Sequence, residues 1–103
     1  MSQEQEKIPE QMTPMCGGWT KVPDGEVKNL QGLLDQVREA AQVIAKRTFT
    51  ALEPLSGSSQ VVAGYNYRIR AYTGNGPNGD FAIFEPPGNG EVSLTSYRDE
   101  PTT

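Results

Sequence analysis

Residues Gln60 to Gly64 read Gln-Val-Val-Ala-Gly, a short apolar run that ends in a glycine. Where such a run turns, it makes a narrow hairpin tip with no side chain at Gly64. A narrow apolar tip can enter a cleft that would exclude a bulkier one. This composition therefore indicates a segment that contacts a partner through Gln60, Val61, Val62, Ala63 and Gly64. An ordinary hairpin corner, with Gly64 at a bend or a bulge, is the competing interpretation.

A second candidate is Cys16-Gly17-Gly18, which precedes an expected strand. Two residues without a Cβ let an extended N-terminal trunk lie against a protein surface and then turn away from it. A plain hinge between a tail and a domain is the other interpretation. Cys16 has no neighbouring base, so we expect it to make a small apolar contact or to oxidise with another molecule, and not to act as a nucleophile.

The third candidate is Pro86-Pro87-Gly88, part of a turn that runs on to Gly90. Proline restricts the backbone and glycine permits unusual dihedral angles, so this composition is typical of a rigid turn. Two interpretations carry equal weight. The segment is either an ordinary turn, or a second wedge made of Pro86, Pro87 and Gly88 that lies beside the first.

The absence of histidine from the 103 residues excludes several kinds of catalytic and metal site. A Ser-His-Asp triad, a Cys-His dyad and a histidine-ligated zinc site cannot be built, and one cysteine cannot supply a thiolate cluster. Catalysis by carboxylates alone and oxygen-ligated metal sites stay open, but the acidic residues form no cluster at a telling spacing. We therefore expect a protein that is not an enzyme and that holds neither a metal nor another cofactor.

The net charge and the cysteine content indicate which partners and which cellular compartment to expect. The net charge of −4 disfavours nucleic acid, because phosphate binding requires a basic stripe. A lone cysteine allows no intramolecular disulfide, which fits a reducing compartment. No apolar stretch is long enough to span a bilayer, and residues 1–7 lack the apolar core of a secretion signal. We expect a cytoplasmic protein with no nucleic acid or membrane partner.

A helix is expected after the glycine pair. Apolar residues recur there at spacings of three and four, as on one face of an amphipathic helix. They are Val27, Leu30, Leu33, Leu34, Val37, Ala41 and Ile44. Pro23-Asp24 supplies a start, and Lys46 and Arg47 lie near the other end, where the helix dipole favours cations.

The remaining segments favour strands joined by short turns. We expect strands at residues 18–21, 48–52, 61–72, 81–84 and 92–97, with a break at 54–59 and a loop at 73–80. Alternation from Val61 to Tyr72 indicates a sheet with one packed face and one wet face. Short connections favour antiparallel order. The predicted fold is α+β, with one long α-helix wrapped by an antiparallel sheet of four to five strands.

The chain is long enough for one small domain and not for two. Residues 1–15 are rich in Gln, Glu and Pro and have few apolar groups, so we interpret them as a mobile N-terminal tail. Residues 16–98 form the expected domain, and residues 99–103 form a frayed C-terminus.

Residues 15–97 resemble the stefins, the disulfide-free, single-domain branch of the cystatins. The stefin trunk resembles Met15-Cys16-Gly17-Gly18, and the first stefin hairpin resembles Gln60 to Gly64 followed by Asn66-Tyr67. Pro87 stands where the second stefin hairpin carries a proline, and Leu94 to Tyr97 resembles the last stefin strand.

This resemblance implies a reversible, competitive, tight-binding inhibitor of papain-like cysteine proteases, including cathepsins of the L, B, H or S type. In that family the trunk and two hairpins line up as one edge, which enters the active-site cleft of the protease without being turned over. The implied contact residues are Cys16, Gly17, Gly18, Gln60, Val61, Val62, Ala63, Gly64, Pro86, Pro87 and Gly88.

Three features depart from the stefin pattern and bear on affinity and target preference. Pro86 replaces the usual apolar residue of the second hairpin, a long tail precedes Cys16, and the chain stops soon after Tyr97. Two alternatives stay open: a non-inhibitory protein-binding module that uses the open sheet face or the loop at 73–80, and an engineered scaffold with altered loops. We expect a monomer, which converts to a domain-swapped dimer if the hairpin at residues 61–63 opens.

Overall fold

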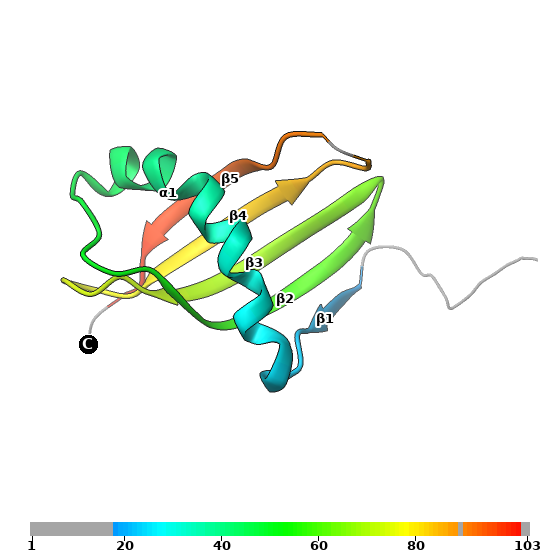
Figure 1. Cartoon of the computed structure of the whole chain (residues 1–103), viewed down its shortest axis with the longest axis horizontal. Helices are drawn as coiled ribbons and strands as arrows, with labels where there is room; N and C mark the ends of the chain where they lie inside the picture. The colour runs from blue at the N-terminus through cyan, green and yellow to red at the C-terminus, as the bar shows by residue number, and fades with distance from the viewer. Residues whose placement is uncertain (1–17, 89, 102–103) are drawn as a thin grey trace, which may run out of the picture.

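The computed structural model describes residues 18–88 and 90–101. Within these ranges the chain forms a five-stranded antiparallel sheet whose spatial order is the chain order. The elements are β1 (Trp19–Lys21), a 3₁₀ helix η1 (Asp24–Leu30), α1 (Gln31–Ala45), β2 (Glu53–Val62), β3 (Gly64–Tyr72), β4 (Gly79–Glu85) and β5 (Ser93–Asp99). Figure 1 shows the helical segment lying across one face of the sheet, which confirms the predicted α+β layout.

The helical segment begins and ends where the sequence predicts, although its first part is a 3₁₀ helix. It starts after Pro23 and ends at Lys46, whose φ of 62° is left-handed and terminates the helix. Most of the predicted inner face is buried or partly buried; these residues are Val27, Leu30, Leu33, Leu34, Val37 and Ala41. The prediction is wrong for Ile44, which is 52% exposed. The last turn of α1 reaches the rim of the sheet near β5 (Figure 1), where the strands no longer cover that side of the helix.

β2 is the largest departure from the prediction. We expected a strand at residues 48–52 and a break at 54–59, whereas 48–52 lie outside the strands and β2 runs through the expected break. The small residues that suggested a break lie where the helical segment crosses the sheet, because a Cβ at Gly57 would lie 2.6 Å from Leu30 Cδ1. A shift of register next to Pro54 accommodates the missing N–H of that proline.

The other strands lie close to their predicted positions. β3 buries Ile69 and Ala71 and exposes Arg68, Arg70 and Tyr72, so the predicted alternation is confirmed for this part of the strand. It is wrong nearer the turn, where Val61, Ala63 and Tyr65 share the parity of Ile69 but are exposed.

β4 includes Asp80, which we expected in the preceding loop. β5 extends to Asp99, which we expected in a frayed C-terminus. Asp99 is ordered because its carboxylate accepts hydrogen bonds from Arg47 and from a tyrosine of β5, and the first of these partners is distant in the sequence.

The core lies between the helical segment and the inner face of the sheet. Its largest fully buried apolar side chains are Phe49, Phe81, Leu34, Ile69 and Ile83. The rings of Phe49, Phe81 and Tyr97 contact one another, and the centroids of Phe81 and Tyr97 are 4.9 Å apart in a T-shaped arrangement. Because Phe49 belongs to the connection between α1 and β2, that connection is fixed on the core without being a strand.

Candidate functional site

The predicted contact segments that the structure describes meet at one end of the molecule. Figure 1 shows the β2–β3 turn, the β4–β5 connection and the start of β1 at this end. β1 is held there because Trp19 pairs with Gln60. Cys16 and Gly17, which we predicted beside Gly18, lie outside the described residues. The name hairpin edge is used below for Gly18, Gln60–Gly64 and Pro86–Gly88.

The first tip of the hairpin edge joins β2 to β3. Ala63 stands alone between Val62 and Gly64, which pair with each other. Val61 is 63% exposed and Val62 is 36% exposed, so both side chains present apolar surface to solvent. Because they are consecutive in β2, the two side chains point to opposite faces of the hairpin, so each face of the tip carries an exposed valine.

Gly64 links the first tip to the second. Its φ of 106° is a conformation that residues with a side chain rarely adopt. A Cβ at this position would collide with the carbonyl oxygen of Glu85 and lie 3.1 Å from Pro86 Cα. Gly64 therefore has a structural role, because it lets the backbone of the second hairpin pack against the first. A substitution at Gly64 tests this packing as well as any contact with a partner.

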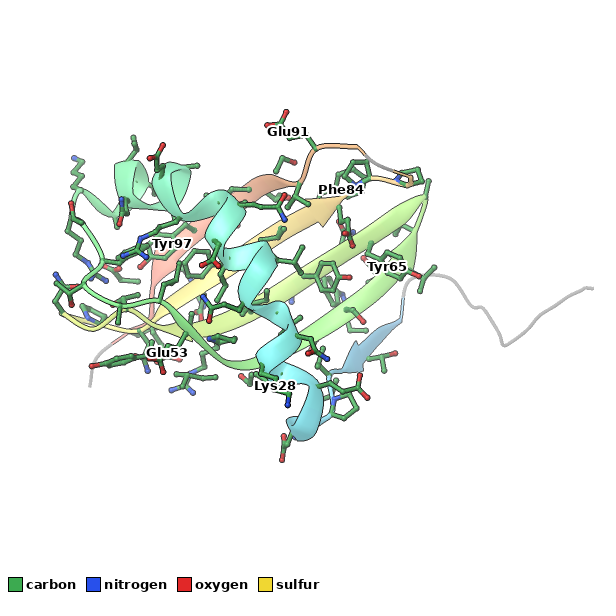
Figure 2. The ribbon with its side chains drawn as sticks, in the orientation of Figure 1. Lys28, Glu53, Tyr65, Phe84, Glu91 and Tyr97 are labelled. Carbon is green, nitrogen blue, oxygen red and sulfur yellow. The ribbon has the colours of Figure 1, made fainter. Side chains whose placement is uncertain are left out.

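Side-chain hydrogen bonds brace the first tip beside its apolar end. Asn66 Nδ2 donates to Gln60 Oε1 at 2.9 Å, which joins β3 to β2. Tyr67 OH donates to Glu85 Oε1 at 3.1 Å, which joins β3 to β4. Burial, assisted by the charge of Glu85, raises the pKa of Tyr67 to about 12, so this phenol remains a donor at neutral pH. Tyr65, labelled at the same end in Figure 2, places its ring 6.1 Å from that of Tyr67.

The second tip is formed by Pro86, Pro87 and Gly88. Pro87 and Gly88 are exposed, and Pro86 is half-buried. Gly88 has a φ of 70°, and a Cβ there would meet no atom within 4 Å, so conformation and not crowding favours glycine. The second tip thus lies next to the first through the contact between Gly64 and Pro86.

The surface of the hairpin edge is mostly apolar. In the two tips the side chains are apolar apart from the amide of Gln60, and backbone groups complete the surface. Among the described residues no group of three or more His, Cys, Asp or Glu side chains is arranged to hold a metal ion. In the same part of the chain, no helix combines the length and apolarity needed to cross a membrane.

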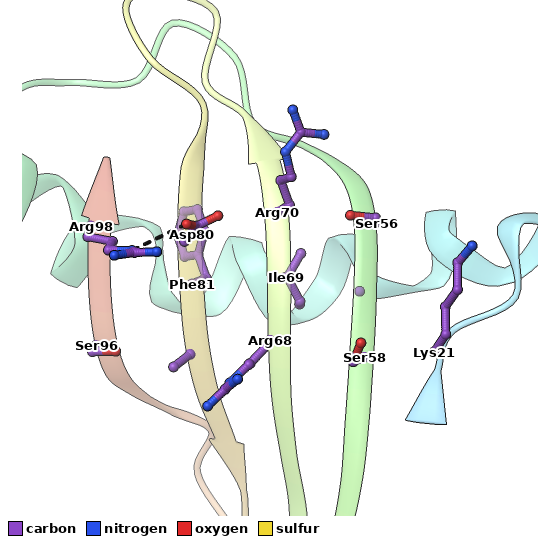
Figure 3. A pocket seen from close by; sticks show the side chains of 12 residues that line it. Lys21, Ser56, Ser58, Arg68, Ile69, Arg70, Asp80, Phe81, Ser96 and Arg98 are labelled. Carbon is purple, nitrogen blue, oxygen red and sulfur yellow. Dashed lines mark hydrogen bonds and ion pairs between the residues drawn. The ribbon is translucent and has the colours of Figure 1, made fainter. Parts of the chain in front are cut away.

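The outer face of the sheet, opposite the helix, carries a trough that the sequence analysis did not find. The trough is lined by the basic side chains of Lys21, Arg68, Arg70 and Arg98. Small residues between them also line it; these are Ser56, Ser58, Ala82 and Ser96. Figure 3 views this face, with α1 behind the sheet. Arg68 and Arg70 are exposed on this face, as the alternation toward Tyr72 predicts for every second residue of the strand. The alternation gave no sign of the carboxylates there, because Glu100 and Asp80, which pair with Arg70 and Arg98, lie on other segments.

Trp19 lies on this outer face as well. Its side chain therefore does not cover the helix. The guanidinium carbon of Arg68, which lines the trough on the face turned away from α1, lies 4.6 Å from the centroid of the Trp19 ring. Trp19 remains 40% exposed.

Comparison with known proteins places these features in a family. No protein-family profile matches the chain. Stefin-C from Bos taurus is 31% identical over 87 residues, which cover 82% of this chain and 85% of that protein. Cystatin-B from Bos taurus is 31% identical over 86 residues, and cystatin-B from Homo sapiens is 29% identical over the same length; each match covers 82% of this chain and 87% of the relative. With this identity over most of both chains, and with a helix packed across a five-stranded antiparallel sheet, the chain belongs to the stefin/cystatin family.

Proposed function

We propose that this chain is a reversible, competitive, tight-binding inhibitor of papain-like cysteine proteases and not an enzyme. Its natural targets are cathepsins of the L, B, H or S type. The hairpin edge enters the active-site cleft as a passive wedge, with Val61 and Val62 at its apolar end. Cys16 and Gly17 continue the wedge from Gly18 as an N-terminal trunk. No side chain of the inhibitor attacks the enzyme, so the inhibitor is released unchanged.

The observation that carries this proposal is the pair of exposed valines on a braced tip. Full burial of a valine side chain contributes about 1.5–3 kcal/mol, and this free energy becomes available when the tip enters a cleft. The hydrogen bonds of Asn66 and Tyr67 fix the tip beforehand, so little conformational entropy is lost on docking. A preorganised interface of about 1,600 Å² in total is sufficient for nanomolar or tighter binding.

The glycine pair supports a trunk beside the first tip. A Cβ at Gly18 would meet no atom within 4 Å, so the chain there is free of crowding by the domain. We expect deletion of residues 1–18 to weaken inhibition more than deletion of residues 1–14, because only the longer deletion removes Cys16-Gly17-Gly18. Equal inhibition constants for the two truncations would show that the glycine pair does not contact the protease.

A titration of papain, with cathepsin L and cathepsin B in parallel, tests the function itself. We expect inhibition that substrate relieves competitively, a stoichiometry of one inhibitor to one enzyme, and slow dissociation of the complex. Unchanged peptide hydrolysis at a molar excess of the chain would contradict the proposal. Binding without inhibition would support a non-inhibitory binding module, for which the trough on the outer face is the available surface.

The inhibitor is proposed to act in the cytoplasm as a monomer. Because Ala63 alone separates β2 from β3, opening this tip would join the two strands into one and let two chains exchange their N-terminal halves. Such a domain-swapped dimer has no first tip and would not inhibit. We expect size-exclusion chromatography after mild heating to resolve an inactive dimer, and the persistence of monomer alone would count against this exchange.

A further inference from the structure

β1 carries the chain into the hairpin edge, and its contacts with the sheet are few. Among the described strands it pairs with β2 alone, through three residue pairs, and all three of its residues are exposed. Val22 N–H adds a backbone hydrogen bond to Gly57 O at 2.8 Å. A strand this short at a sheet edge has little burial to hold it in one direction. The path of Gly18 and of the residues before it therefore depends on how firmly Trp19 is fixed.

Arg68 supplies an additional contact to this edge strand. It lies on β3 opposite Ser58, whereas Trp19 lies on β1 opposite Gln60, so the two side chains meet over the outer face of the intervening strand β2. The guanidinium carbon is 4.6 Å from the ring centroid, within the range of a cation–π interaction. This contact ties the first strand of the sheet to the third.

Arg68 differs from the other arginines of the outer face. Arg70 pairs with Glu100, and Arg98 pairs with Asp80, which is the ion pair drawn in Figure 3. Within residues 18–88 and 90–101, Arg68 forms no ion pair of its own. Since no carboxylate of the described residues pairs with it, the Arg68 guanidinium can lie over the Trp19 ring, whose quadrupole attracts it.

We propose that Arg68 is a positioning residue for the N-terminal trunk. Its contact with Trp19 fixes β1 and thereby the direction in which Gly18 leads the trunk toward the first tip. This inference rests on the proposed inhibitory function and deepens it. Arg68 acts on affinity through Trp19 and does not itself touch the protease.

A double-mutant cycle in the full chain tests this role, with the inhibition constant for papain as the readout. Arg68→Ala is combined with Gly17→Ile, a change that hinders docking of the trunk itself. Arg68→Ala alone is expected to weaken inhibition about fivefold, which corresponds to the loss of one exposed cation–π contact. In the Gly17→Ile background it is expected to have no further effect, because the two changes act through the same segment.

Two further variants separate the contact from the charge. Arg68→Lys keeps a cation over the ring and is expected to retain most of the affinity. Arg70→Ala, on the same strand and face, is the matched control and is expected to leave the inhibition constant within about twofold, as for most exposed ion pairs. Arg68→Ala and Arg70→Ala thus remove the same side chain at neighbouring outward positions, and only the first contacts Trp19.

Trp19 is the only tryptophan of the chain, so the fluorescence of the free protein reports on this contact directly. Arg68→Ala is expected to shift the emission to longer wavelength and to speed hydrogen exchange at the amides of β1, whereas Arg70→Ala changes neither. These two readouts need no protease. If the parent chain fails to inhibit papain, the proposed function falls, and the fluorescence and exchange data still decide whether Arg68 fixes β1.

If Arg68→Ala leaves the tryptophan emission and the hydrogen exchange of β1 unchanged, Arg68 does not fix β1 and the proposal is overturned. Equal inhibition by Arg68→Ala and the parent would overturn the positioning role. The same loss of affinity with and without Gly17→Ile would overturn it too, because Arg68 would then act on the protease directly or through the whole fold.

Discussion

The two ends of the sheet are built in different ways. At the hairpin edge, exposed apolar side chains cap two turns that are held by backbone packing at Gly64 and by hydrogen bonds beside the tip. At the opposite end, side-chain hydrogen bonds converge on one guanidinium, that of Arg47. Figure 2 places Tyr65 and Tyr97 toward these opposite ends. The name Arg47 end is used below for residues 46–52, 73–78 and 97–100.

Arg47 joins segments that are far apart in the sequence. Its side chain donates to Thr73 Oγ1 at 3.2 Å, Asn75 Oδ1 at 3.2 Å, the carbonyl oxygen of Asn75, Pro77 O at 3.0 Å, Tyr97 OH at 3.4 Å and Asp99 Oδ1 at 3.2 Å. The guanidinium carbon also lies 5.0 Å from the ring centroid of Phe49. One side chain therefore holds the connection after α1, the loop before β4 and the end of β5.

The two ends of the sheet therefore have different roles, one in the stability of the fold and the other in the proposed contact with a partner. Apolar side chains at the Arg47 end, such as Phe49 and Tyr97, are buried. Most of its polar groups are hydrogen-bonded, although Arg47 Nε is buried without a partner among the described residues, so this end contributes mainly to stability. Val61 keeps 63% and Val62 keeps 36% of its surface exposed at the hairpin edge, so part of their apolar surface could still be buried against a partner. Substitutions at the Arg47 end should therefore change the free energy of unfolding, and substitutions at the exposed valines should change the inhibition constant.

The largest effect is expected at the Arg47 end. Arg47→Met should lower the free energy of unfolding by about 3 kcal/mol, because it leaves several partly buried acceptors without their donor. Urea denaturation measures this loss. Arg98→Met, which removes an exposed arginine from β5, should change stability far less. Inhibition of papain by the folded fraction of Arg47→Met should equal that of the parent, and a drop in both quantities together would contradict this difference in roles.

A smaller effect on stability is expected at the point where the two tips meet. Gly64→Ala should lower the free energy of unfolding by about 2 kcal/mol, because it adds strain at a positive φ and a collision with the backbone of Glu85. Gly88 also has a positive φ but has open space around it, so Gly88→Ala is the control. It measures the loss of stability that comes from the backbone conformation without a collision. Equal losses for the two variants in thermal unfolding would show that close packing of the tips contributes nothing.

The smallest effect is a dependence of stability on pH at the Arg47 end. Burial, together with the hydrogen bond to Asp99, raises the pKa of Tyr97 from 10.0 to about 12. Because this pKa is raised on folding, the contribution of Tyr97 is fully present below pH 10.0 and is lost as the pH rises toward about 12. The hydrogen bond from Tyr97, and then Arg47, hold the pKa of Asp99 below its usual 3.8, so that contribution is present above pH 3.8 and is lost in stronger acid.

The free energy of unfolding in urea, measured across this pH range, checks both the alkaline and the acid loss of stability. Tyr97→Phe should flatten the alkaline loss, and Asp99→Asn should flatten the acid loss. Parallel curves for Tyr97→Phe and the parent above pH 10.0 would exclude Tyr97 as a source of the alkaline loss.

The parts of the fold that local patterns determine could be predicted from the sequence. The spacing of Val27 to Ala41 gave the helix, and the alternation through Ile69 and Ala71 gave the central strand. β2 could not be predicted, because its small residues resemble a break until the crossing of Leu30 over Gly57 is known. That crossing is a contact between distant segments.

The same limit applies to the candidate site. The composition of residues 60–64 and 86–88 was enough to identify two tips. The reason that Gly64 must be glycine lies in the second hairpin, which no pattern near Gly64 reveals. The acceptors of Arg47 are in part backbone carbonyls of the loop before β4, so the sequence carried no sign of them.

The most direct test of the wedge compares the inhibition constants of Val62→Asp and Leu55→Asp for papain. Both variants place a carboxylate at an exposed apolar position of β2; Val62 is 36% exposed at the hairpin edge, and Leu55 is 43% exposed near the other end of the strand. Val62→Asp should raise the inhibition constant at least about thirtyfold, or about 2 kcal/mol, because a charge would enter a desolvated site. Leu55→Asp should leave the constant within about twofold, and both proteins should keep the parent's stability within about 0.5 kcal/mol. Inhibition by Val62→Asp that matches both Leu55→Asp and the parent would contradict the insertion of the hairpin edge into the cleft.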